Sequence, residues 1–334
     1  MNKPNKKVNP HTFKRIMKTL IGYYPVLVPV TVFCILFSAI AAAIPDIFIQ
    51  KIIAIIEVWQ PDKNWTAAVK EITPLMVILI SMYVISIIAV TVYSELMAFI
   101  TQGFLSKLRI SMFGGMQNLP IKYFDTNKHG DIMSYYTNDI DTLRQLISQS
   151  MPALIRSIAI VIGVFFIMLY YSVWMTLLLL VGVAAKKVGG GSAKYFIKQQ
   201  QSIGKAEGFI QEMMNGQKVI KVFNHEEECI SDFEEINTAL CDDSCKANAY
   251  ANILGPIIMN IGNIIYVLIA VAGGLFLLSG VPNISISGLG FSISIIIPFL
   301  NMTKQFTGNI NQLSQQINSI VMGLAGAERI FALM

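Results

Sequence analysis

The sequence predicts an all-α membrane protein with six transmembrane helices and long cytoplasmic helical extensions. Hydrophobic residues make up 54% of the 334 residues and charged residues only 13%, whereas soluble domains carry about 25% charged residues. Apolar runs long enough to cross a bilayer recur along the chain. Two long charged segments, about 106–150 and 186–246, interrupt these runs and extend beyond the bilayer.

The first 22 residues are predicted to form a basic cytoplasmic arm and an interfacial elbow helix. Lysines and an arginine lie on one face of this helix. The opposite face carries apolar residues at helical spacing, namely Phe13, Ile16, Met17, Leu20 and Ile21. Such a helix lies on the inner leaflet, and Tyr24-Pro25 favours a break before the first span. A plain cytoplasmic extension of the first span is the alternative.

Residues 23–334 are predicted to form one transmembrane domain with six spans. Their approximate bounds are 23–56, 72–105, 151–171, 173–186, 250–279 and 288–320. The fourth is short, because Val173 to Ala185 supplies 13 residues before Lys186, whereas a crossing takes about 20. Such a short span could still insert if its lysines snorkel to the interface and the bilayer thins locally. The alternative is that the shortened span makes the protein inactive.

Lysines and arginines indicate the orientation in the membrane. They lie mostly in the arm and in the two charged segments, which the positive-inside rule places in the cytoplasm. The loop 57–71 carries only Lys63 and Lys70, and the turn 280–287 carries no charge, so both face outward. We therefore expect a multi-pass protein of the cell membrane with both termini in the cytoplasm.

The two charged segments are longer than a turn between spans requires. About 18 residues from Gly103 to Pro120 extend roughly 27 Å as a helix at 1.5 Å per residue. The stretches 187–214 and 226–246 of the second segment have a similar reach. Each hairpin ends in a short non-periodic tip, at about 123–131 and 215–223, and we expect these tips to contact a partner beneath the membrane.

Three stretches carry a resemblance to one family. Tyr123-Phe124-Asp125 through Ser134, followed by Asn138 to Asp141, is similar to the first intracellular loop of exporters of the ATP-binding cassette (ABC) superfamily. Gly216 to Phe223, followed by Glu226, is similar to the second loop. Gly323 to Phe331 resembles the segment that leads from the sixth span toward the nucleotide-binding domain. The resemblance covers essentially the whole chain, and the three motifs in this order are specific.

The resemblance implies the type 1 transmembrane domain of a half-transporter, a permease subunit that pairs with a second half-transporter as a homodimer or heterodimer. In the family each tip forms a coupling helix that docks in a nucleotide-binding domain, which binds ATP and Mg²⁺. These helices are expected at about Thr126 to Ser134 and Asn215 to Phe223. The implied coupling residues are Tyr123, Thr126, Lys128, Gly130, Asp131, Gly216, Val219, Lys221, Phe223 and Glu226.

No phosphate-binding loop of the Gly-x-x-x-x-Gly-Lys-Ser/Thr type occurs in the sequence. We therefore expect no catalytic residue, no bound cofactor and no ATPase activity from this chain by itself, with the nucleotide-binding domain supplied elsewhere. The four cysteines lack zinc-type spacing, and no clustered basic patch favours nucleic-acid binding. A truncated, non-transporting remnant or membrane scaffold is the alternative function.

Amide and charged residues inside the spans are the candidates for a transport pathway, because they are costly against lipid. They are Asn260 and Asn263 in span five, and Asn301, Lys304, Gln305, Asn309, Gln312 and Gln316 in span six. The span-six residues share a rough stripe at helical spacing and would line a hydrated cavity for an amphiphilic substrate. A solvated or dimer-packing face is the alternative for this stripe.

Overall fold

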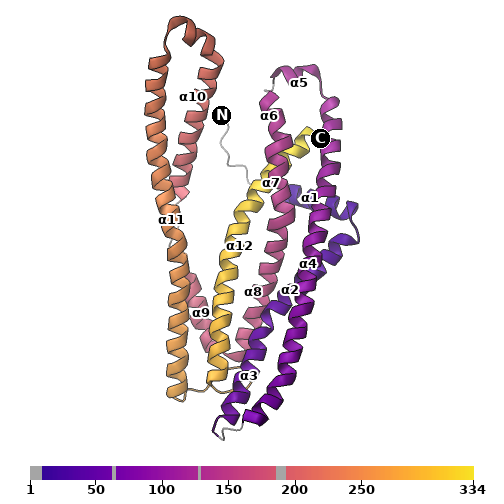
Figure 1. Cartoon of the computed structure of the whole chain (residues 1–334), viewed down its shortest axis with the longest axis vertical. Coiled ribbons are helices and arrows are strands. Elements are labelled where there is room, and N and C mark those ends of the chain that lie inside the picture. Colours follow the sequence, from indigo (N-terminus) through magenta and orange to yellow (C-terminus); the bar gives the residue numbers. More distant parts are fainter. Residues whose placement is uncertain (1–9, 62–64, 127–128, 186–192) are drawn as a thin grey trace. The chain divides into compact units, whose positions relative to one another are not determined.

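The computed structural model describes residues 10–61, 65–126, 129–185 and 193–334, and this part of the chain is helical, without strands (Figure 1). The helices are α1 (Pro10–Tyr23), α2 (Leu27–Ala43), α3 (Pro45–Trp59), α4 (Trp65–Gln117), α5 (Ile121–Thr126), α6 (His129–Ser134), α7 (Ile140–Gln145), α8 (Met151–Tyr171), α9 (Val173–Ala185), α10 (Ala193–Phe223), α11 (Glu226–Leu278) and α12 (Ile293–Leu333). Two π-helical turns, η1 (Tyr135–Asp139) and η2 (Leu146–Ser150), lie on either side of α7.

Four helical stretches of the described chain are long and apolar enough to cross a membrane. They are Leu27–Trp59, Trp65–Gln117, Ile132–Tyr171 and Asn260–Leu278. These stretches correspond to four of the six predicted spans. The fourth predicted span corresponds to the apolar stretch Val173–Val183, which is shorter, and the sixth falls in the amide-rich α12. The chain is thus a helical membrane protein, and the count of six spans stays a prediction.

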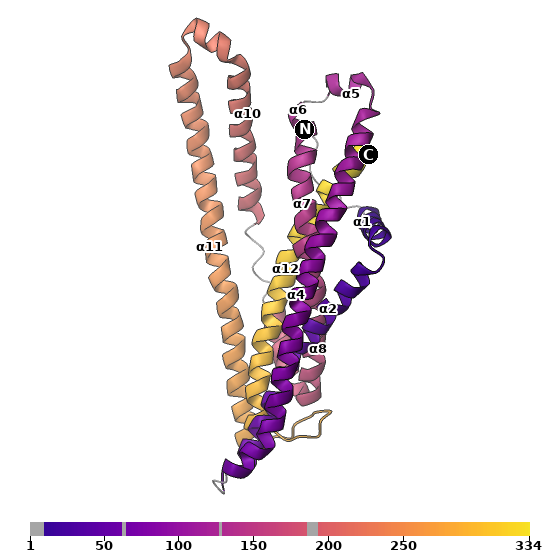
Figure 2. The same ribbon diagram turned by 45° about the vertical axis from the view of Figure 1, so that its right-hand side comes forward.

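The chain divides into two compact units, residues 1–176 with 270–334 and residues 177–269. In the described part of the first unit, α12 packs along α8 and α3, and α2 packs against α4 and α8. Figure 2 shows α4, α8 and α12 lying lengthwise along this unit, with the chain in α8 running opposite to that in α4 and α12. One continuous rod of α6, η1, α7, η2 and α8 therefore lies beside α12 over much of its length.

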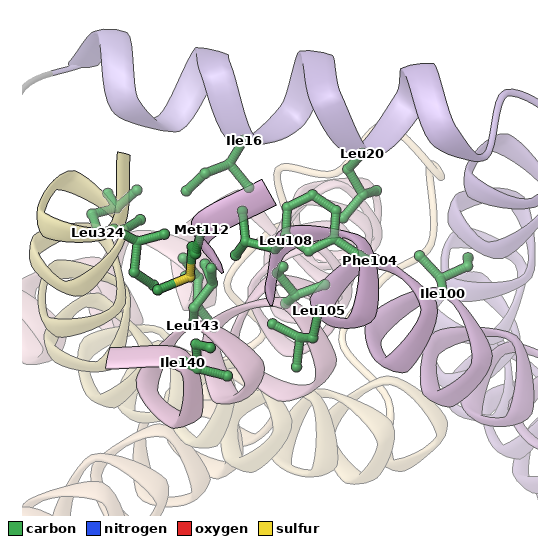
Figure 3. Close-up of a cluster of buried hydrophobic side chains, with 14 of the residues drawn as sticks. Ile16, Leu20, Ile100, Phe104, Leu105, Leu108, Met112, Ile140, Leu143 and Leu324 are labelled. Atoms are coloured by element: carbon green, nitrogen blue, oxygen red, sulfur yellow. The ribbon is translucent and has the colours of Figure 1, made fainter. Parts of the chain in front are cut away.

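A hydrophobic core of the described residues lies where α1 crosses α4. Ile16 and Leu20 point from α1 toward Phe104, Leu108 and Met112 of α4 (Figure 3). Leu143 and Leu324 bring α7 and α12 into the same cluster. Burying a side chain of this size stabilises the packing by about 1.5 to 3 kcal/mol. Protein contacts therefore hold one side of the elbow helix α1.

The predicted apolar stripe of α1 is divided between two environments. Ile16 and Leu20 are fully buried, whereas Phe13 and Ile21 are exposed. Helix α1 ends at Tyr23, and α2 begins at Leu27, two residues after Pro25. The exposed part of the stripe is what remains available to lipid.

The second unit contains a hairpin made by α10 and the first part of α11. Tyr195 stacks on Tyr250 with ring centroids 4.2 Å apart, and Phe209 stacks on Phe233 at 6.1 Å. Asn224 turns the chain at a positive φ of 53°, where asparagine is among the better-tolerated residues that have a Cβ. These aromatic pairs and this turn determine how the two arms of the hairpin meet.

Candidate functional site

The first hairpin runs from the end of α4 through α5 to α6 and η1, and its tip holds five of the predicted coupling residues. The Thr126 hydroxyl donates to the Lys122 carbonyl oxygen at 2.8 Å, and Gly130 is exposed. Lys128 lies outside the described residues, and of Asp131 only the backbone, in α6, is described. Among the described residues the tip holds two short helices, α5 and α6, and α6 covers the larger part of the stretch 126–134 predicted as a coupling helix.

Tyr123 packs inside the first hairpin. Its ring lies edge-on to Phe124 with centroids 5.7 Å apart, and it contacts the core cluster. Partial burial, with Tyr135 beside it, raises the pKa of Tyr123. The large exposed apolar side chains of this tip are instead Ile121 and Met133, which the sequence interpretation did not single out. Their exposure marks them as the part of the tip available to a partner.

The second tip carries a row of exposed apolar side chains. Phe223 is 66% exposed and Val222 75% exposed, and Val219 is exposed as well. Helix α10 continues through Gly216 to Phe223, so the segment predicted as a separate coupling helix is the last part of α10 (Figure 2). Across the turn, Lys221 Nζ lies 2.9 Å from Glu226 Oε1, and this hydrogen bond lowers the pKa of Glu226.

A groove of about 370 Å³ lies beneath the second tip, between the two arms of the hairpin. Its lining is mostly apolar and comprises Phe209, Ile210, Met213, Met214, Gln217, Ile220, Glu226, Cys229, Ile230 and Phe233. Residues of both arms line this groove, and several of them are exposed. The region beneath the tip is therefore an open apolar surface.

The end of α12 is held by an ion pair with the first hairpin. Arg329 Nε donates to Asp139 Oδ2 at 2.9 Å, and a second guanidinium nitrogen contacts Oδ1. Asp139 is 1% exposed, while the Arg329 side chain is 60% exposed. An arginine that contacts both oxygens of a carboxylate forms the strong type of ion pair. Among the described residues, Arg329 is the only charged partner of the buried Asp139 carboxylate.

Two glycines allow α12 to approach the first hairpin closely at the same place. A Cβ at Gly326 would lie 2.6 Å from Thr142 Oγ1, and one at Gly323 would lie 2.6 Å from the Leu146 Cβ. On the other side of α12, the Arg15 guanidinium of α1 lies 4.2 Å from the ring centroid of Phe331. We call this contact of Asp139, Gly323, Gly326 and Arg329 with their neighbours the α12 junction.

The predicted polar stripe of α12 is split between two faces. Asn301, Lys304 and Gln312 are exposed. Gln305 instead donates from Nε2 to the Ala42 carbonyl oxygen at 2.9 Å, and Asn309 donates to the Gln305 carbonyl oxygen at 2.8 Å. Gln316 is half-buried. Only the exposed residues of the stripe are available to line a cavity in this arrangement.

The two asparagines predicted in span five lie in α11 within the second unit. Asn260 and Asn263 are both exposed, and Asn260 Nδ2 donates to the Pro256 carbonyl oxygen at 2.9 Å. A shallow groove that includes Asn252, Pro256 and Asn260 runs along this part of α11. Among the described residues, no cluster of three or more His, Cys, Asp or Glu side chains could hold a metal ion.

A buried carboxylate joins the two arms of the second hairpin. Asp243 of α11 accepts hydrogen bonds from Ser202 Oγ at 2.6 Å and Lys198 Nζ at 2.9 Å, both in α10. These hydrogen bonds, that of Ser202 first, hold the pKa of Asp243 below its ordinary value. The carboxylate thus stays ionised at pH values where a free aspartate begins to take up a proton.

We expect this link to be lost only in acid. The pKa of Asp243 is lower in the folded protein than in the unfolded chain. The ionised carboxylate therefore contributes its whole stabilisation of the fold above the ordinary aspartate pKa of about 3.9, and this contribution disappears as the pH falls through the lowered value. The protection factors of the α10 amides, which compare the measured exchange rate with the intrinsic rate at each pH, should fall only at the acid end between pH 7 and pH 3. Asp243→Asn should exchange faster already at pH 7, whereas Asp242→Asn, at the exposed neighbour, should match the wild type; equal exchange in all three would contradict the assignment.

A family model and several known proteins match most of this chain. A family model described as the ABC transporter transmembrane region matches residues 28–303. An uncharacterized ABC transporter ATP-binding protein of Bacillus subtilis is 30% identical over 268 residues, which cover 79% of this chain and 43% of that protein. The fatty acid ABC transporter ATP-binding/permease protein of Mycobacterium tuberculosis is 26% identical over 257 residues, which cover 75% of this chain and 39% of that protein.

A more distant relative is the ATP-dependent lipid A-core flippase of Salmonella typhimurium. It is 22% identical over 232 residues, which cover 68% of this chain and 38% of the flippase. The matched part of this chain thus spans between 38% and 43% of the length of these three relatives.

Proposed function

This chain belongs to the family of ABC transporter transmembrane regions, and we propose that it is the membrane-spanning permease subunit of an ATP-driven exporter. In this proposal it crosses the cell membrane six times with both termini in the cytoplasm. It pairs with a second half-transporter to enclose the transport pathway. Nucleotide-binding domains, on the same or another polypeptide, bind ATP and Mg²⁺, and the transmembrane region itself hydrolyses nothing.

The observation that carries this proposal is the pair of hairpins with exposed apolar tips. Large apolar side chains are exposed at both tips, Phe223 and Val222 at one and Ile121 and Met133 at the other. Exposed apolar side chains grouped in this way favour contact with another protein. A long rigid helix carries a displacement at its tip to its other end, which is how closure of an attached domain could reorient the spans.

The α12 junction gives the first hairpin a route to the transport pathway. The ion pair of Asp139 with Arg329 links the hairpin to α12, and the same helix carries the exposed Asn301, Lys304 and Gln312. Rotation of α12 with the hairpin would expose these polar side chains to one side of the membrane and then to the other. Alternating access of this kind needs two helix arrangements of similar free energy, which ATP binding then biases.

An amphiphile is the substrate class that fits best. Exposed amides and a lysine on α12 stand beside long apolar helix faces, so the pathway offers polar contacts and an apolar wall together. Two of the relatives are named for lipidic cargo, a fatty acid in one and the lipid A core in the other. We therefore propose a lipid-like amphiphile with a polar head group.

The test is ATP hydrolysis by the complex reconstituted in liposomes with its nucleotide-binding domains. We expect Phe223→Ala combined with Val219→Ala to reduce substrate-stimulated hydrolysis at least tenfold, because the tip loses its exposed apolar contacts. Both side chains are exposed, so membrane insertion and thermal unfolding should be unchanged. Asn248→Ala, on the exposed stalk of the same hairpin, serves as the matched control. Unchanged stimulation in the double variant would refute coupling through this tip.

A further inference from the structure

Two thiols lie next to each other on α11, away from the hairpin tips and from the α12 junction. Cys241 and Cys245 are one helical turn apart, and both are exposed. Residues at this spacing share one face of a helix. The two thiols are close enough for Cys245 to influence Cys241, because it is the main cause of the raised pKa of the Cys241 thiol.

The pair plays no part in the packing of the hairpin. Asp243 and Ala247 are the buried residues of this stretch, and Asp243 contacts Ser202 and Lys198 of α10. Because Cys241 and Cys245 are exposed, they lie on a different face from the one that meets α10. A group bound to both sulfur atoms can therefore be accommodated without disturbing the link between the arms.

The chemistry of two adjacent sulfur atoms limits what can bind. A structural zinc ion needs four ligands, and among the described residues no cluster of three or more His, Cys, Asp or Glu side chains is present. Soft acceptors that are satisfied by two sulfur atoms remain, and sulfur ligands favour soft elements. Organic compounds of trivalent arsenic are of this kind, since the arsenic atom keeps its carbon substituent and forms two bonds to sulfur.

The environment of Cys241 disfavours the commoner reactions of cysteine at that thiol. The neighbouring Cys245 thiol, and to a smaller extent desolvation and the charge of Asp242, raise the pKa of the Cys241 thiol. A protonated thiol is slow toward alkylating agents and peroxides, because both react with the thiolate. An arsenoxide consumes two protonated thiols together and needs no preformed thiolate.

We propose that Cys241 and Cys245 form a dithiol site for organic trivalent arsenicals. An arsenoxide loses its arsenic–oxygen bonds and gains two arsenic–sulfur bonds, and the oxygen leaves as one water molecule with the two thiol protons. No atom changes its oxidation state, so the reaction needs no other reagent. The product is a ring that spans one turn of α11, and the site does not depend on the proposed transport function.

Phenylarsine oxide added to the full chain in detergent tests the site. We expect intact-mass measurement to show one phenylarsenic group per chain that survives excess 2-mercaptoethanol and is removed by 2,3-dimercaptopropanol. Cys241→Ser and Cys245→Ser should each lower occupancy at least tenfold at one equivalent of reagent. Cys34→Ser and Cys229→Ser are the matched controls and should bind as the wild type does.

Thermal unfolding of each variant shows whether a loss of binding reflects a loss of fold. The substituted thiols are exposed, so Cys241→Ser and Cys245→Ser should unfold at the wild-type temperature. Retention of the phenylarsenic group in either variant would overturn the proposal. Removal of the adduct by the monothiol would overturn it too, because that result means attachment to single cysteines.

Discussion

Arg329→Ala is expected to lower the free energy of unfolding by about 3 kcal/mol, because it leaves the buried carboxylate of Asp139 without its charged partner. The same change should release the end of α12 from the first hairpin. Denaturant unfolding in mixed micelles measures the first effect. Hydrogen exchange of the amides from 323 to 333 measures the second, and these should exchange faster than those of α8.

A double-mutant cycle separates the ion pair from other effects of truncation. Asp139→Ala combined with Arg329→Ala should cost less than the sum of the single changes, by about 2 kcal/mol, because the double variant buries no unpaired charge. Asp141 and Arg144 form the matched control pair at 2.8 Å in α7, where both side chains are exposed. Their coupling should not exceed about 0.5 kcal/mol. Equal coupling in the two pairs would contradict the role given to Asp139.

Gly326→Val is expected to be the most disruptive change to the packing of α12. Its Cβ would lie 2.6 Å from Thr142 Oγ1 and 3.3 Å from the Asp139 carbonyl oxygen, so α12 must move away from the hairpin. We expect a loss of about 3 kcal/mol, at the upper end of the usual range for overpacking. Thermal unfolding of the purified chain should show the destabilisation, and ATP hydrolysis by the reconstituted complex should fall with it.

Gly308→Ala is the matched control for this substitution in the same helix. A Cβ at Gly308 meets no atom within 4 Å. Alanine in a helix interior is more favourable than glycine by about 0.5 to 1 kcal/mol, so this variant should be as stable as the wild type or more stable. Wild-type stability in Gly326→Val would show that α12 does not pack against η1 and α7 as described.

The helices and the family could be predicted from the sequence because their signals are local. Apolar runs of sufficient length predict membrane helices, and the motifs around Tyr123, Gly216 and Gly323 lie within short stretches of chain. The family match over residues 28–303 confirms the resemblance. The break between α1 and α2 also has a local cause, since Pro25 lacks a backbone donor.

The contacts of the candidate site could not be predicted, because they join distant parts of the chain. Asp139 and Arg329 are 190 residues apart, and each belongs to a motif whose partner the sequence does not name. Periodicity placed Gln305 with Lys304 on one stripe, but Gln305 bonds to the Ala42 carbonyl oxygen, which only the packing of α12 determines. The packing of Tyr123 against the core cluster, which draws residues from α1, α4 and α12, is likewise set by the fold.

Photo-crosslinking from the second tip in native membranes tests most directly whether the hairpins couple this membrane region to ATP. A benzophenone amino acid at Phe223 is expected to form an adduct with a domain that an azido-ATP photolabel also marks. The same probe at Asn248, on the exposed stalk, should not. Absence of the Phe223 adduct from a chain that inserts and unfolds like the wild type would contradict the account.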